Sequence, residues 1–206
     1  SRGGQSEMRY GQLVSGNYFS VLGIQAAAGR TFLPEEDQTP GAHPIVVLSH
    51  NFWTRRLGGD PNVIGSTVVL NGRGFTVVGV APSGFTGLLP GFGSDFWIPL
   101  MMAEQLGAGR LLENQSSLWL FVAGRMQPGV TTPQAQAELA TLASQLAQAN
   151  PDTHKNHGVI AVPMARALIG AGIAWALATA YFWLLNRTSG VAFILAMIGG
   201  LAIGLV

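Results

Sequence analysis

The residues whose types and spacing most clearly suggest a chemical function lie in the stretch "VVLNGRGFTVVGVAP", residues 68–82, where Gly72 and Gly74 stand among apolar residues. Closely spaced glycines can bring backbone N–H groups against a phosphate, as they do in nucleotide-binding loops. A dinucleotide fingerprint needs a third glycine where this chain has Val77, and a helix must follow it, whereas β-rich sequence follows here. A Walker loop needs its own lysine, and the only lysine of the sequence is Lys155. The stretch therefore predicts no nucleotide site.

The same stretch is typical of a β-hairpin. Two runs rich in β-branched residues, "STVVL" and "FTVVGVA", flank the sequence Asn71-Gly72-Arg73-Gly74. An Asn-Gly step between such runs favours a tight turn, because both residues tolerate the positive φ that this turn requires. We expect a hairpin whose turn is formed by Asn71, Gly72 and Gly74.

Other polar clusters lack the partners that catalysis or metal binding requires. His154 and His157 share a polar loop without a third fixed ligand, and the acids at 35–37 suit the first turn of a short helix. Ser49 precedes a histidine, but the sequence has no glycine-flanked serine elbow. Arg55 and its neighbour form too small a basic patch for nucleic acid. We expect no catalytic, cofactor-binding or metal-binding residues, no cofactor, no nucleic-acid partner and no enzymatic activity.

The elements around these residues alternate between strands and helices. Ser49 can cap a helix after the apolar run "IVVLS", and Pro133 suits the first turn of a helix that runs to about Ala149. Strands are predicted at residues 45–49, 66–70, 75–81, 96–100, 116–126 and 158–164. A helix between the last two strands favours a βαβ unit. We predict an α+β domain over residues 1–163, in which a mixed sheet packs against helices.

Residues 164–206 have a different composition. From Arg166 onward the only charges are Arg166 and Arg187, and apolar runs occupy about 167–185 and 190–206. Spanning a bilayer takes about 20 mainly apolar residues. We therefore predict two C-terminal transmembrane helices, with the lipid bilayer as a partner. A buried helical hairpin of a soluble protein is the alternative, although buried helices seldom run this long without a polar face.

Small residues recur at a spacing of four in both runs. Gly170 is followed by Ala174, and Gly200 is followed by Gly204. Such steps let transmembrane helices approach each other closely. The polar turn between the runs covers only residues 186–189, so we expect the two helices to pack as an antiparallel pair through these four small residues.

Three blocks of the sequence resemble a known family. They are "VSGNYFSVLGIQAAAGRTFLPEED", "IVVLSHNFWTRRLGGDPNVIGSTVVLNGRGFTVVGVAPSGF" and "FVAGRMQPGVTTPQAQAEL". In this order and spacing they resemble the periplasmic core domain of MacB-like ABC transporter permeases, and in particular the duplicated permeases common in acidobacteria. The resemblance covers about residues 10–160.

The resemblance implies a function in transport. It places residues 1–163 in the periplasm of a bacterium and the spans in the inner membrane. ATP is then hydrolysed by a separate subunit or domain, and permease helices carry the motion to the periplasmic domain. A second permease copy and a periplasmic partner protein are further expected partners. The tail departs from the family pattern, because no basic cytoplasmic segment separates the two apolar runs.

Two functions from different classes remain open at this point. The first is a non-enzymatic permease subunit that transmits motion from a separate ATPase to the periplasm. The second is a membrane-anchored extracytoplasmic sensor or ligand-binding module, since sensors also use mixed sheets. A ligand-sized pocket in the polar domain would favour the sensor.

Overall fold

The computed structural model describes residues 7–88, 93–108, 112–113, 119–154, 158–164 and 204–205. Their contacts form two compact units, the first made of residues 1–125 and 201–206 and the second of residues 126–200. The predicted spans at 167–185 and about 190–206 fall almost wholly outside the described residues. Among the residues that are described, no helix is both long enough and apolar enough to cross a membrane.

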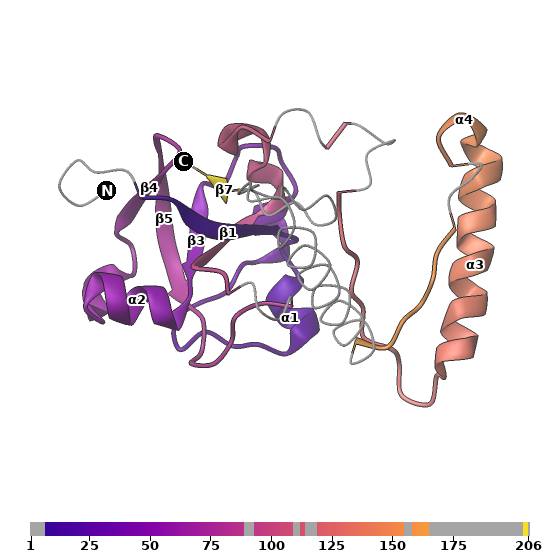
Figure 1. Cartoon of the computed structure of the whole chain (residues 1–206), viewed down its shortest axis with the longest axis horizontal. Helices are drawn as coiled ribbons and strands as arrows, with labels where there is room; N and C mark the ends of the chain where they lie inside the picture. Colours follow the sequence, from indigo (N-terminus) through magenta and orange to yellow (C-terminus); the bar gives the residue numbers. More distant parts are fainter. Residues whose placement is uncertain are drawn as a thin grey trace, which may run out of the picture. The chain divides into compact units, whose positions relative to one another are not determined.

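The first unit is built on a mixed sheet of seven strands in its described part (Figure 1). The strands are β1 (Arg9–Val14), β2 (Ala28–Gly29), β3 (Ile45–Leu48), β4 (Thr67–Leu70), β5 (Arg73–Val80), β6 (Phe96–Pro99) and β7 (Gly204–Leu205). Their order is β2-β5-β3-β6-β1-β7, and β4 also pairs with β5. The β1–β6 and β3–β5 pairs are parallel and the others antiparallel. This confirms the predicted mixture of sheet and helix.

The strands β3 and β6 lie at the centre of the sheet and are buried on both faces. Val46 and Leu48 face one apolar core, whereas Val47 between them faces a second core on the other side. In β6, Ile98 belongs to the first core and Trp97 to the second. A strand covered on both faces has no polar side, which explains why the runs "IVVL" and "FWIP" are continuously apolar.

A bulge shifts the inward-facing positions of β5. Val46 pairs with Val77, but the next residue of β3, Val47, pairs with Gly79, so Val78 is an extra residue in β5. Because one inserted residue reverses the alternation of side chains, Val77 and Val80 point into the same core although they are three positions apart.

Short helices cover the two faces of the sheet. The first core is closed by α2 (His50–Leu57), and the second by α1 (Tyr18–Leu22), which contributes the buried Phe19. The predicted cap of α2 is confirmed, since Ser49 Oγ accepts a hydrogen bond from the Phe52 N–H at 3.1 Å. The 3₁₀ helices are η1 (Pro34–Asp37), η2 (Pro61–Val63), η3 (Leu100–Met102) and η4 (Glu104–Leu106).

The second unit contains α3 (Thr132–Ala149), α4 (Pro151–His154) and the segment 158–163, which has no regular secondary structure and runs beside α3 (Figure 1). The predicted helix after Pro133 is confirmed. The predicted strands at 116–126 and 158–164 are wrong for their described residues, which form no strand.

The two mispredicted segments have the composition of strands, but their described residues do not pair with a neighbouring strand. A strand is stable only when its backbone N–H and C=O groups find partners, and side chains of both segments are exposed here. The exposed fraction is 75% for Phe121, 96% for Val122 and 82% for Ile160. At residues 159–161 the side chain of Gln136 supplies the backbone partner instead.

Candidate functional site

The hairpin of β4 and β5 has a two-residue turn. Leu70 pairs with Arg73, and the residues between them, Asn71 and Gly72, have φ values of 49° and 77°. Gly74 lies beyond the turn, in β5, where it pairs with Val69. The Asn71 side chain donates a hydrogen bond to the carbonyl oxygen of Leu106 at 2.9 Å. The turn is thus tied to η4, and a strand rather than a helix follows the glycines, so the geometry differs from that of a phosphate-binding loop.

The predicted helix-packing residues fall mostly outside the described structure. Gly170, Ala174 and Gly200 lie outside the described residues, and Gly204 is described only as part of β7, where it pairs with Tyr10 of β1. Their packing in the membrane stays a prediction.

Metal-ligating side chains are dispersed in the described part of the chain. No group of three or more His, Cys, Asp or Glu residues there could hold a metal ion. Asp152 and His154 both lie on α4, and His157 lies outside the described residues.

The carboxylate of Asp37 joins three separate segments of the first unit. Its Oδ2 accepts a hydrogen bond from the Gly16 N–H at 3.0 Å, and its Oδ1 accepts one from the Met101 N–H at 2.8 Å. Asp37 therefore fixes η1 to the end of β1 and to η3. Both carboxylate oxygens accept hydrogen bonds from backbone N–H groups, so the role that this geometry gives Asp37 is to position loops.

A bidentate ion pair holds the loop next to Asp37. The Arg30 guanidinium donates to both carboxylate oxygens of Glu36, at 2.7 and 2.6 Å, and the Leu33 N–H donates to one of them at 2.9 Å. Burial raises the pKa of Glu36, but these hydrogen bonds outweigh burial, so its pKa is lowered. Glu36 consequently stays ionised and serves as a fixed acceptor.

Charged side chains also gather where the chain enters β1. Glu7 pairs with Arg9 and, at 3.0 Å, with Arg56 of α2. The Arg9 guanidinium lies 3.8 Å from Asp95 and 5.8 Å from the centre of the Phe52 ring. Burial raises the pKa of Asp95, and the charge of Arg9 opposes that rise. These contacts tie the start of β1 to α2.

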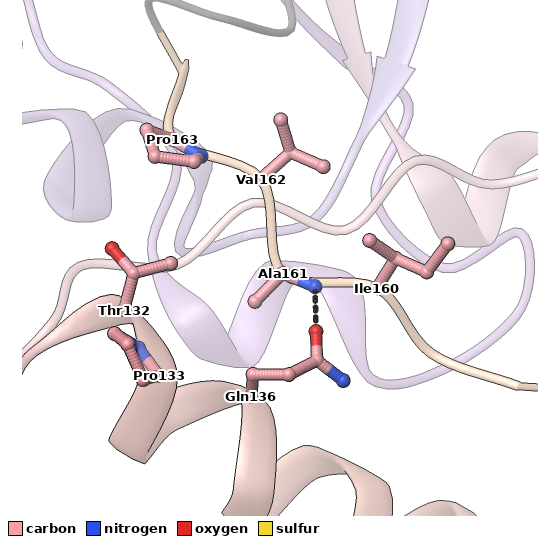
Figure 2. Close-up of a pocket in the computed structure, with 7 residues that line it drawn as sticks. All are labelled: Thr132, Pro133, Gln136, Ile160, Ala161, Val162 and Pro163. Carbon is pink, nitrogen blue, oxygen red and sulfur yellow. Dashed lines mark hydrogen bonds between the residues drawn. The ribbon is translucent and has the colours of Figure 1, made fainter.

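A pocket of about 660 Å³ lies within the second unit, between the first turn of α3 and the segment beside it (Figure 2). Its lining residues are Thr132, Pro133, Gln136, Ile160, Ala161, Val162 and Pro163. Its volume is typical of ligand sites, but such sites also present a few convergent polar groups. Only Thr132 and Gln136 have polar side chains in this lining, and the Gln136 amide is already bonded to the backbone at 159 and 161. The pocket thus has the volume expected of a sensor's ligand site, but it lacks the convergent polar groups that would recognise a ligand.

Sequence reasoning missed the positioning residues Asp37 and Gln136. The sequence places Asp37 only within an acidic helix start, and it gives no signal that singles out Gln136. Their partners are 21 and 64 residues away for Asp37, and 23 and 25 residues away for Gln136. No local pattern marks contacts of that range.

One curated protein whose name refers to export is similar to part of this chain. The Probable syringafactin export ATP-binding/permease protein SyfD of Pseudomonas syringae pv. tomato is 33% identical over 99 residues, which make up 48% of this chain and 14% of that protein. The chain therefore spans only a small part of that relative's length.

Two solved structures are similar at lower identity. The periplasmic region of MacB from Actinobacillus actinomycetemcomitans is 16% identical with a TM-score of 0.47, and the match covers 70% of this chain and 58% of that chain. The extracellular domain of the noncanonic ABC-type transporter YknZ from Gram-positive bacteria is 14% identical with the same TM-score, covering 70% of this chain and 66% of that chain.

The sequence model of one family matches residues 1–142, which include all of the first unit's strands except β7. This match covers more than half of the 206 residues. The chain belongs to the MacB-like periplasmic core domain family.

Proposed function

We propose that this chain is a non-enzymatic permease subunit that carries motion from a separate ATPase into the periplasm. The observation that carries the proposal is the family match over residues 1–142. The 206 residues contain no nucleotide-binding motif, so the proposal assigns ATP binding to a part outside them. The relative named as an export ATP-binding/permease protein supports a role in transport.

The contacts of the first unit suit a part that is moved as one body. Two close-packed cores fill both sides of the sheet. Hydrogen bonds and an ion pair hold the intervening loops in place, and they come from Asp37, from the Arg30–Glu36 pair and from the Asn71 side chain. Close-packed interiors have low compressibility and transmit strain. A force applied at one edge of this unit would therefore reach the opposite edge with little deformation.

The proposal also fixes a location and a set of partners. Residues 1–163 lie in the periplasm, and the apolar runs at 167–185 and 190–206 cross the inner membrane. The partners are the lipid bilayer, an ATP-binding subunit or domain, a second permease copy and a periplasmic protein. These assignments derive from the family and from the apolar tail.

The test is to purify the tagged full chain from its own host in mild detergent and to measure ATP hydrolysis with and without its co-purifying proteins. We expect no hydrolysis by the chain alone, and hydrolysis by a complex that contains a subunit with a Walker loop. The variant Lys155→Ala serves as the control, and it should leave the hydrolysis by the complex unchanged. The proposal would be refuted if the chain alone hydrolysed ATP and this hydrolysis were lost in Lys155→Ala. It would also be refuted if no ATPase were associated with the chain.

A further inference from the structure

An apolar stripe runs along the segment that follows α4. Ile160, Val162 and Met164 are alternate residues with exposed fractions of 82%, 50% and 41%. Figure 2 shows Ile160 and Val162 directed away from α3, whereas Ala161 between them is directed toward the helix. We call Ile160, Val162 and Met164 the Ile160 stripe.

The side chain of Gln136 holds this segment against α3. Its Nε2 donates to the Val159 carbonyl oxygen at 2.9 Å, and its Oε1 accepts from the Ala161 N–H at 2.6 Å. The amide thus binds the backbone on both sides of Ile160, as a neighbouring strand would. The two bonds hold the backbone on either side of Ile160, and of residues 158–164 only Ala161 is half-buried while the others are exposed.

The sequence around the stripe carries little charge. Residues 158–165 contain no Asp, Glu, Lys or Arg, Arg166 follows them, and α3 has Glu138 as its single charge. Soluble proteins rarely expose contiguous apolar surface of this kind unless it meets a partner. The absence of charge favours an apolar partner over one that is recognised by ion pairs.

The position of the stripe in the chain indicates which partner this is. Met164 stands three residues before Ala167, where the first apolar run begins. Three residues reach at most about 10 Å. The polar layer on each side of a bilayer is about 5–8 Å thick, and apolar side chains of interfacial segments enter it by about 5–10 Å. Once residues 167–185 are in the bilayer, Met164 has lipid within its reach, and Ile160, seven residues before Ala167, lies at most about 25 Å from that residue.

We propose that the Ile160 stripe contacts the outer lipid surface of the membrane, with Gln136 as the positioning residue that orients it. The inference rests on the proposed function, because that function places residues 167–185 in the bilayer. The occupant is lipid, and a protein surface is the competing outcome of the test.

The test uses fluorescence of the full chain in vesicles of phosphatidylcholine and phosphatidylglycerol. The sequence has no cysteine, so Ile160→Cys can be labelled alone with an environment-sensitive dye. Ile160 has few contacts to lose, because it is mostly exposed. Two quenchers are compared, a nitroxide on the lipid headgroup and iodide in the water. The matched control is Gln148→Cys, an exposed position on α3 about 18 Å along the helix from Gln136.

We expect the dye at position 160 to show blue-shifted emission and a loss of intensity with the headgroup nitroxide, whereas the dye at position 148 responds to iodide alone. In Ile160→Cys combined with Gln136→Ala, the nitroxide effect should become smaller. Quenching of position 160 by iodide alone would overturn the proposal by showing an open surface. Protection from both quenchers would overturn it by showing a protein cover, from this chain, a second copy or another protein.

Carbonate extraction of the same vesicles separates this inference from the proposed function. If the chain resists extraction and position 160 is not quenched by the nitroxide, the lipid contact is wrong and the membrane topology stands. If the chain is extracted, residues 167–185 are not in the bilayer, and both the topology and the lipid contact are wrong.

Discussion

Gly72 is the residue whose backbone conformation depends most directly on its type. Its φ is 77°, and a Cβ added there would meet no atom within 4 Å. Any cost of a side chain therefore comes from the left-handed backbone and not from crowding. We expect Gly72→Val to lower the free energy of unfolding by about 1 kcal/mol or more.

The measurement is urea unfolding of the chain in detergent, with Gly124→Val as the control. Gly124 also has open space around it, but its φ lies outside the left-handed region. Its substitution should change the free energy of unfolding little. Equal stabilities of Gly72→Val and the wild type would contradict the turn.

Asp37 is a second residue on which the first unit depends. Asp37→Ala would leave the N–H groups of Gly16 and Met101 without their acceptor in a partly buried place. Hydrogen bonds to a charged group contribute about 1.5–3 kcal/mol, so we expect a loss of that order in the free energy of unfolding. The control is Glu35→Ala, since Glu35 lies exposed on the same 3₁₀ helix. A loss no larger than that of the control would show that Asp37 does not join these segments.

At the scale of elements, Gln136 takes the place of a strand neighbour for the segment beside α3. Gln136→Ala removes both bonds to the backbone at 159 and 161. We expect faster hydrogen exchange of the Ala161 amide, because its acceptor is lost. Gln145→Ala, an exposed position on the same helix, is the control. Unchanged exchange at Ala161 would mean that the amide of Gln136 does not hold this segment.

Local sequence patterns predicted those elements that depend on neighbours in the sequence. Each of these patterns follows from a requirement of the residues in it: positive φ at the Asn71-Gly72 step, a helix cap at Ser49, and burial on both faces in the apolar runs of β3 and β6. The runs at 116–126 and 158–164 have strand composition, but a strand also needs a partner distant in the sequence. That information is absent from a local pattern, so their described residues were mispredicted.

At the scale of the whole molecule, the composition and the order of the sequence blocks that resemble a family told more about function than single residues did. The three sequence blocks that resemble MacB-like domains lie within about residues 10–160, and the family match covers residues 1–142. The sensor hypothesis depended on a pocket, and the described pocket has the required size without convergent polar groups. The direction in which the chain crosses the membrane follows from the proposed function, and it can be measured.

Cysteine labelling in intact cells tests the central claim most directly, since the chain has no native cysteine. Arg55→Cys places a thiol at an exposed position of α2, and Ser189→Cys places one in the turn between the two apolar runs. We expect a membrane-impermeant reagent to label the first variant in intact cells, and to label the second only after the cells are lysed. The opposite pattern would place the sheet domain in the cytoplasm and would contradict its role as the periplasmic part of a permease.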